Sequence, residues 1–108
     1  MIVVIFEVEP IDGKADQYFD IAAALRDELE RTDGFVSVER FQSLSNDGKF
    51  LSLSFWMDEE AVQRWYTHID HSAAQSEGKD SVFKYYRIRV GEIVRDYDMS
   101  VGRPEDLS

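Results

Sequence analysis

The chain has 108 residues, 44% of them hydrophobic, which is enough for one globular domain with its own core. Its 12 Lys and Arg against 22 Asp and Glu give a net charge of −10, with no basic footprint for nucleic acid or an anionic membrane. Cysteine is absent, which excludes disulfides, thiolate zinc sites and cysteine nucleophiles. The start, MIVVIFEVEP, has no basic leader and is too short to span a bilayer, so we expect a cytoplasmic protein.

The first third of the chain predicts a strand followed by a helix. Residues Ile2–Val8 are apolar at nearly every position, which is typical of a strand buried on both faces. Apolar side chains then recur with helical spacing from about Ala15 to Arg31. Asp33-Gly34 follows, and a glycine just beyond the last turn is a common helix end.

The middle of the chain predicts a β-hairpin. Phe35–Ser43 and Lys49–Trp56 have the composition of strands, and they flank Asn46-Asp47-Gly48, a strong hairpin signal. Because side chains alternate along a strand, each of these segments offers residues to two faces of a sheet.

The last part of the chain predicts helical segments and a long strand. Asp58-Glu59-Glu60 puts acidic residues at a helix start, where the backbone dipole favours them. A second short helix is expected over Ile69–Ser76, and a strand from Ser81 to about Tyr97. The remaining residues, Asp98–Ser108, are expected to form a loose polar tail.

The predicted order is therefore β-α-β-β-α-β, the ferredoxin-like arrangement of the α+β class, with residues 1–97 as one domain. Helices can cover only one face of such an antiparallel sheet, whereas the strands carry apolar residues on both faces. A second copy of the chain, packed sheet against sheet, would bury the other face. We therefore expect a homodimer.

Side chains suited to a flat aromatic ligand gather between Trp56 and His71. Trp56, Trp65, His68 and His71 fall within about one strand end and a few helical turns, so they can stack on a ring and exchange protons with it. Each has a plainer reading. The tryptophans can be ordinary core residues, and a histidine can bond to backbone at the surface.

The two histidines are three residues apart, a spacing compatible with two metal ligands on one helix face. No motif marks a third ligand, so no metal site is predicted. On the last strand, Arg87 and Arg89 share a face with Tyr85. They can stabilise an anion, or they can pair with carboxylates such as Glu7 at a dimer seam.

Nearly the whole chain resembles the antibiotic-biosynthesis-monooxygenase-like family of dimeric α+β barrels. The residues that carry the resemblance are IVVIFEV, GFVSVERFQS, LSLSFWMDEEAVQRW, HIDHSAAQSEGK and YYRIRVGEIVRDY. The resemblance implies a dimer and, in one branch of the family, cofactor-independent oxygenation of anthrone- or quinol-type polyphenols. A second branch degrades haem, and many members have no defined activity.

Both branches match this chain in part. The oxygenase branch keeps a Trp at the end of the third strand, an Asn four residues earlier and a Tyr six residues later. Here the positions hold Trp56, Ser52 and Val62. The haem branch uses a first-strand Asn, a second-helix Trp and an iron-ligating His ten residues after that Trp. Glu7, Trp65 and Gln75 stand there, and Gln75 is a poor replacement for an imidazole ligand.

The sequence thus predicts a cofactor-independent monooxygenase acting on a small aromatic molecule, without metal. The alternatives are a non-catalytic ligand-binding or stress-response module and, third, a haem protein. The residues predicted to be catalytic are His71, Trp56 and Arg87. The residues predicted to line the substrate pocket are Trp65, His68, Tyr85, Tyr86 and Gln75.

Overall fold

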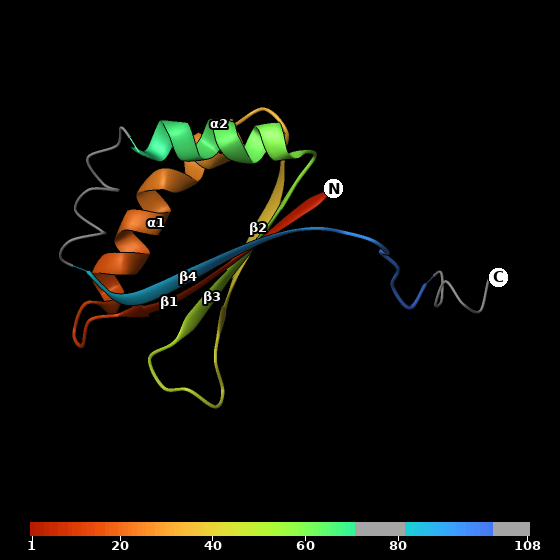
Figure 1. Cartoon of the computed structure of the whole chain (residues 1–108). Helices are drawn as coiled ribbons and strands as arrows, with labels where there is room; N and C mark the ends of the chain where they lie inside the picture. The colour runs from red at the N-terminus through yellow and green to blue at the C-terminus, as the bar shows by residue number, and fades with distance from the viewer. Residues whose placement is uncertain (71–81, 101–108) are drawn as a thin grey trace.

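The computed structural model describes residues 1–70 and 82–100 and confirms the predicted order of elements. Both helices lie on one side of a single antiparallel sheet with strand order β2-β3-β1-β4 (Figure 1). The fold is therefore the α+β, ferredoxin-like one expected from the sequence. The elements are β1 (Ile2–Pro10), α1 (Ala15–Glu30), β2 (Phe35–Gln42), β3 (Phe50–Trp56), α2 (Glu59–Asp70) and β4 (Phe83–Glu92).

The strand register divides the sheet into two faces. Directly opposite residues share a face, so a row running through Arg40, Ser52, Phe6 and Ile88 faces the helices. The next row, Glu39, Leu53, Ile5 and Arg89, faces away from them. We call these the helix-covered face and the outer face. Five half-buried apolar residues occupy the centre of the outer face: Val3, Ile5, Leu51, Leu53 and Phe55.

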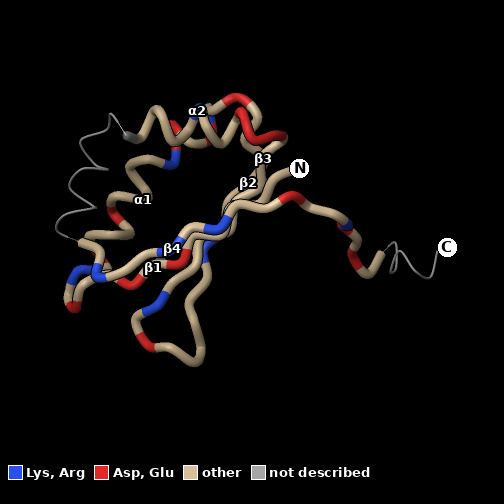
Figure 2. The backbone as a smooth tube through the Cα atoms, viewed as in Figure 1, with Lys and Arg blue, Asp and Glu red and all other residues tan. Residues whose placement is uncertain are grey.

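Local sequence signals explain the turns that carry the chain between the layers. Asp58 accepts a hydrogen bond from the backbone N–H of Ala61 at 2.9 Å and so caps α2, whose acidic start is visible in Figure 2. Gly34 has a φ of 90°. A Cβ there would also lie 2.6 Å from the Cβ of Ala61, so this turn can bring β2 close to α2 only with glycine.

Two boundaries differ from the prediction. The helix α2 runs without a break to Asp70, so Ile69 belongs to it and not to a second helix. The last strand ends at Glu92 rather than near Tyr97. Beyond Ile93, which donates its N–H to the carbonyl of Met1, the chain has passed the end of β1 and has no neighbouring strand to pair with.

One side chain of β4 also departs from the regular alternation of faces. Phe83 packs against the aromatic rings of Phe6 and Tyr86, although strict alternation would place it opposite Tyr86. The register between β1 and β4 shifts at Glu9/Pro10, which gives β4 one extra residue at this point. Proline has no N–H for the ladder, and such positions favour an irregularity of this kind.

The hydrophobic core consists of two clusters on the helix-covered face. One gathers around Trp56 and α2 and contains Val4, Leu29, Ala61, Val62, Trp65 and Ile69. The other, Val8, Tyr18 and Val82, lies at the start of α1. Neither described helix is long and apolar enough to cross a membrane.

Candidate functional site

A cavity of about 330 Å³ lies between the helix-covered face and the two helices, and it touches both core clusters. This volume falls at the lower end of the roughly 300–1,000 Å³ that is usual for small-molecule sites. All four strands and both helices contribute to its lining. The described lining residues are Val4, Phe6, Tyr18, Ile21, Ala22, Leu25, Leu29, Val38, Arg40, Ser52, Ser54, Trp56, Trp65, Tyr66, Ile69, Phe83, Tyr86 and Ile88.

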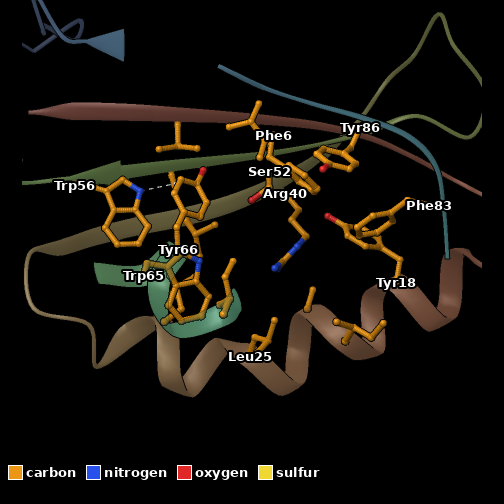
Figure 3. Close-up of a pocket in the computed structure, with 18 residues that line it drawn as sticks. Phe6, Tyr18, Leu25, Arg40, Ser52, Trp56, Trp65, Tyr66, Phe83 and Tyr86 are labelled. Atoms are coloured by element: carbon orange, nitrogen blue, oxygen red, sulfur yellow. Dashed lines mark hydrogen bonds between the residues drawn. The ribbon is translucent and has the colours of Figure 1, made fainter. Parts of the chain in front are cut away.

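Aromatic side chains form the two ends of this cavity. Trp56 is 2% exposed, and its indole N–H donates to Ser54 Oγ at 2.9 Å (dashed in Figure 3), which satisfies its polar group inside the core. Trp65 and Tyr66 come from α2 at the same end, whereas Phe83 and Tyr86 come from β4 at the other (Figure 3). The walls are therefore suited to the faces of a flat, apolar ligand.

One cation, Arg40, enters the cavity among the described lining residues. It leaves the sheet from β2 and points toward α1, between Trp65 and Tyr18 (Figure 3). Its Nε is shielded from solvent and has no hydrogen-bond partner among the residues that the structure describes. A buried donor without a partner is uncommon in proteins, because it loses its bond to water without replacement.

Two tyrosines of the lining hold their protons more firmly than usual. Burial raises the pKa of the Tyr18 hydroxyl above its ordinary 10.0, against the opposing effects of the Arg40 charge and of a hydrogen bond with Arg40. Burial also raises the pKa of Tyr66. Both hydroxyls are thus neutral hydrogen-bonding groups near pH 7, and neither is a ready base.

The structure brings three of the predicted site residues to this cavity. Trp56, Trp65 and Tyr86 all contribute to its lining. Tyr85 and Arg87 do not, because the β1–β4 register places them on the outer face, opposite Glu9 and Glu7. Tyr85 is 49% exposed there. The next arginine, Arg89, makes the structural pairing considered from the sequence, with its Nη1 3.3 Å from Glu7 Oε2.

His68 contributes nothing to the described lining. His68 lies on the exposed side of α2, where its Nε2 is 3.2 Å from Glu28 Oε2 on α1 and its ring packs near that of Trp65. His71 and Gln75 lie outside the described residues. Within residues 1–70 and 82–100, no group of three His, Cys, Asp or Glu side chains could hold a metal ion.

The residues that sequence reasoning missed are Arg40, Tyr18 and Tyr66. A signal for Arg40 was available, because it follows Val38 by two residues and so shares the face of an apolar strand position. For Tyr18, the helical stripe indicated burial but not its contact with Arg40. That contact joins residues far apart in the sequence, and only the folded chain shows it.

Comparison with known proteins identifies relatives of this fold. Residues 1–77 match the family described as antibiotic biosynthesis monooxygenase. Over 93 residues the chain is 46% identical to a protein of Pyricularia oryzae named jasmonate monooxygenase ABM; the match covers 86% of this chain but 43% of that relative.

Solved structures show the same fold at low sequence identity. SnoaB, a cofactor-independent oxygenase from Streptomyces nogalater, superposes with a TM-score of 0.75 at 12% identity, over 88% of this chain and 94% of its own. MhuD, solved with two manganese protoporphyrin IX molecules per active site, superposes with a TM-score of 0.73 at 18% identity, over 91% and 99%. The chain thus shares its architecture with proteins of different chemistry.

Proposed function

The chain belongs to the antibiotic biosynthesis monooxygenase family, and from this premise we propose that it oxygenates a small aromatic substrate of the quinol or anthrone type without a cofactor. The observation that carries the proposal is the cavity itself. It is small, its walls are aromatic and aliphatic, and one guanidinium enters it. Such a site can hold a planar molecule and keep water away from it.

The reaction needs only the substrate and dioxygen. Loss of a proton from the reacting CH₂ group of an anthrone-type substrate gives an electron-rich anion, which passes one electron to O₂. The two radicals combine, and the resulting peroxide loses water to leave a carbonyl. The CH₂ hydrogens leave in that water together with one oxygen atom, and the other oxygen stays in the product.

The protein's tasks in this scheme are to accept the first proton, to exclude water and to orient the ring. We propose His71 as the proton acceptor, because an imidazole titrates near neutrality. Trp56, Trp65 and Tyr86 serve as the walls. Arg87 takes no part in this cavity, since it lies on the outer face.

A His71→Ala substitution tests this assignment. Loss of a general base lowers turnover by roughly 10²–10⁴-fold. The variant should keep the circular dichroism spectrum and thermal midpoint of the wild type. His68→Ala is the matched control, because its ring lies away from the cavity and we expect turnover within about twofold of the wild type. Unchanged turnover in His71→Ala would remove this histidine from the mechanism.

The alternative is a ligand-binding module that performs no reaction. It is favoured by one observation: the described lining contains no His, Asp or Glu that could accept a proton. The same part of the lining offers haem iron no imidazole, and Gln75, at the position of the family's iron ligand, lies outside the described residues, so a haem protein stays the third alternative.

Oxygen uptake by metal-stripped, haem-free protein separates these functions. The panel consists of anthrones, naphthoquinols and catechols, with jasmonate added because of the Pyricularia relative. We expect enzyme-dependent uptake and an oxidised product with at least one of the aromatic substrates. Uptake no faster than autoxidation throughout, together with saturable ligand binding, would support the binding module instead.

We further propose that the chain forms a homodimer through the outer face. Five half-buried apolar side chains occupy the centre of this face, and neither helix covers it. Sheet-on-sheet packing against a second copy would remove them from water.

A further inference from the structure

Arg40 differs from three other described arginines in the partners of its guanidinium group. Arg26 pairs with Glu30, Arg89 pairs with Glu7, and Arg64 donates to the carbonyl of Asp33. Among residues 1–70 and 82–100, Arg40 has no carboxylate within ion-pair distance, and its buried Nε has no acceptor. Within the described part of the chain, the polar group that interacts with it is the neutral hydroxyl of Tyr18.

The surroundings of Arg40 make this arrangement unfavourable for an empty cavity. On the sheet it is opposite Ser52, in the row that continues to Phe6 and Ile88, and it faces α1 across the cavity. Arg40 is half-buried, but a guanidinium N–H that is shielded from water, as its Nε is, needs an acceptor in place of the lost water. The described walls supply hydroxyl groups but no carboxylate.

We propose that Arg40 is the recognition group for a small organic oxyanion, a carboxylate or a phenolate carried by an apolar ring. This inference rests on the proposed function, since it names the substrate class of the same cavity. The planar fork of a guanidinium binds two oxygens, or one oxygen by two N–H groups, and Nε is one of the donors that such a contact uses.

The position of Arg40 also sets the orientation of the ligand. The charged group lies near β2 and Tyr18, and the ring extends toward the aromatic end formed by Trp56 and Trp65 (Figure 3). A molecule with an anionic head and an apolar body satisfies both parts of the cavity. A neutral molecule of the same shape leaves the Nε of Arg40 without an acceptor and binds less tightly.

Isothermal titration calorimetry under nitrogen tests the proposal without any turnover. The probes are 2-naphthoate, its uncharged methyl ester and 2-naphthol. We expect the naphthoate to bind at least tenfold more tightly than the ester at pH 7. Affinity for 2-naphthol should rise with pH if the phenolate is the bound form, which distinguishes the two oxyanions.

Substitution of Arg40 locates the recognition group. Arg40→Met keeps the length of the side chain and removes its charge, so naphthoate affinity should fall by roughly 10–150-fold, the value of a hydrogen bond to a charged group. Ester affinity should change by less than twofold. Arg40→Lys keeps the charge without the fork and should be intermediate. Arg26→Met, at an exposed arginine of α1, is the matched control and should bind as the wild type does.

Several results would overturn the proposal. These are equal affinities of the wild type for naphthoate and ester, no measurable binding of either oxyanion, or unchanged naphthoate affinity in Arg40→Met. If Arg40→Met does not fold, the contrast between acid and ester in the wild type and in Arg40→Lys decides the question. An inactive protein that still shows Arg40-dependent binding would refute only the oxygenase. An active oxygenase whose naphthoate affinity is unchanged in Arg40→Met would refute only the oxyanion.

Discussion

The two faces of the sheet use the same kinds of residues for different purposes. Arg40 and Arg89 lie in neighbouring rows of the sheet but on opposite faces. Arg89 is paired with Glu7 on the outer face, whereas the Nε of Arg40 has no acceptor in the cavity. The outer face thus pairs Arg89 with a carboxylate and is apolar at its centre, as an interface requires. The helix-covered face leaves one described donor, the Nε of Arg40, for a ligand to bind.

Substitution of neighbouring residues on β3 gives the largest expected difference between the faces. Trp56→Ala should lower the free energy of unfolding by about 3–5 kcal/mol at every protein concentration, because it empties a buried aromatic site. Phe55→Ala, on the outer face, should act mainly on dimer association, so its effect should depend on concentration. Guanidinium chloride unfolding at two concentrations measures both. Equal, concentration-independent losses would contradict the difference between the faces.

A charge placed on the outer face tests the proposed dimer. Leu53→Glu would bury a carboxylate without a partner between the two sheets, and we expect the dimer dissociation constant to rise by at least about 100-fold. Light scattering coupled to size-exclusion chromatography should then report the mass of one chain. Val94→Glu makes the same change at a side chain that is 83% exposed beyond β4 and should leave the dimer intact. A wild type that is monomeric at all concentrations would refute the interface.

The smallest expected effect is the change in the free energy of unfolding at alkaline pH, which depends on Tyr18 in the cavity of the helix-covered face. The raised pKa of Tyr18 means that the folded chain holds this proton more tightly than the unfolded chain does. The resulting stabilisation is complete below about pH 10, the ordinary tyrosine value, and is lost as pH rises through the raised pKa. The free energy of unfolding should therefore fall above pH 10. Tyr18→Phe should make that fall shallower, whereas Tyr97→Phe, at an exposed side chain, should leave it unchanged; equal slopes in both variants would contradict the assignment.

Much of the fold could be predicted from the sequence because its signals are local. The helical stripe of α1, the Asn46-Asp47-Gly48 turn and the acidic start of α2 each depend on residues a few positions apart. The end of β4 could not be predicted in this way. Val94 and Tyr97 have strand-like composition, but β1 is too short to pair with them. The register shift at Glu9/Pro10 was also not predictable from local signals, because it changes the face of Phe83 on another strand, β4.

The candidate site was predicted less completely. Trp56, Trp65 and Tyr86 stood out by residue type, and the structure places all three around the cavity. Residue type alone favoured the arginines of β4 as partners of an anion. Arg40, on β2, has the same chemistry, but it is not part of a sequence segment with several arginines and tyrosines, as Arg87 and Arg89 are.

The sequence by itself determined the order of the elements and which residues of each strand share a face, since alternation and helical spacing are properties of the local backbone. It did not determine which of the two faces would receive the helices. That choice depends on the crossings of α1 and α2 over the sheet, which involve contacts between distant residues such as Gly34 with Ala61 and Tyr18 with Arg40. Tertiary packing therefore decided that Arg40 enters the cavity and that Arg87 lies outside it.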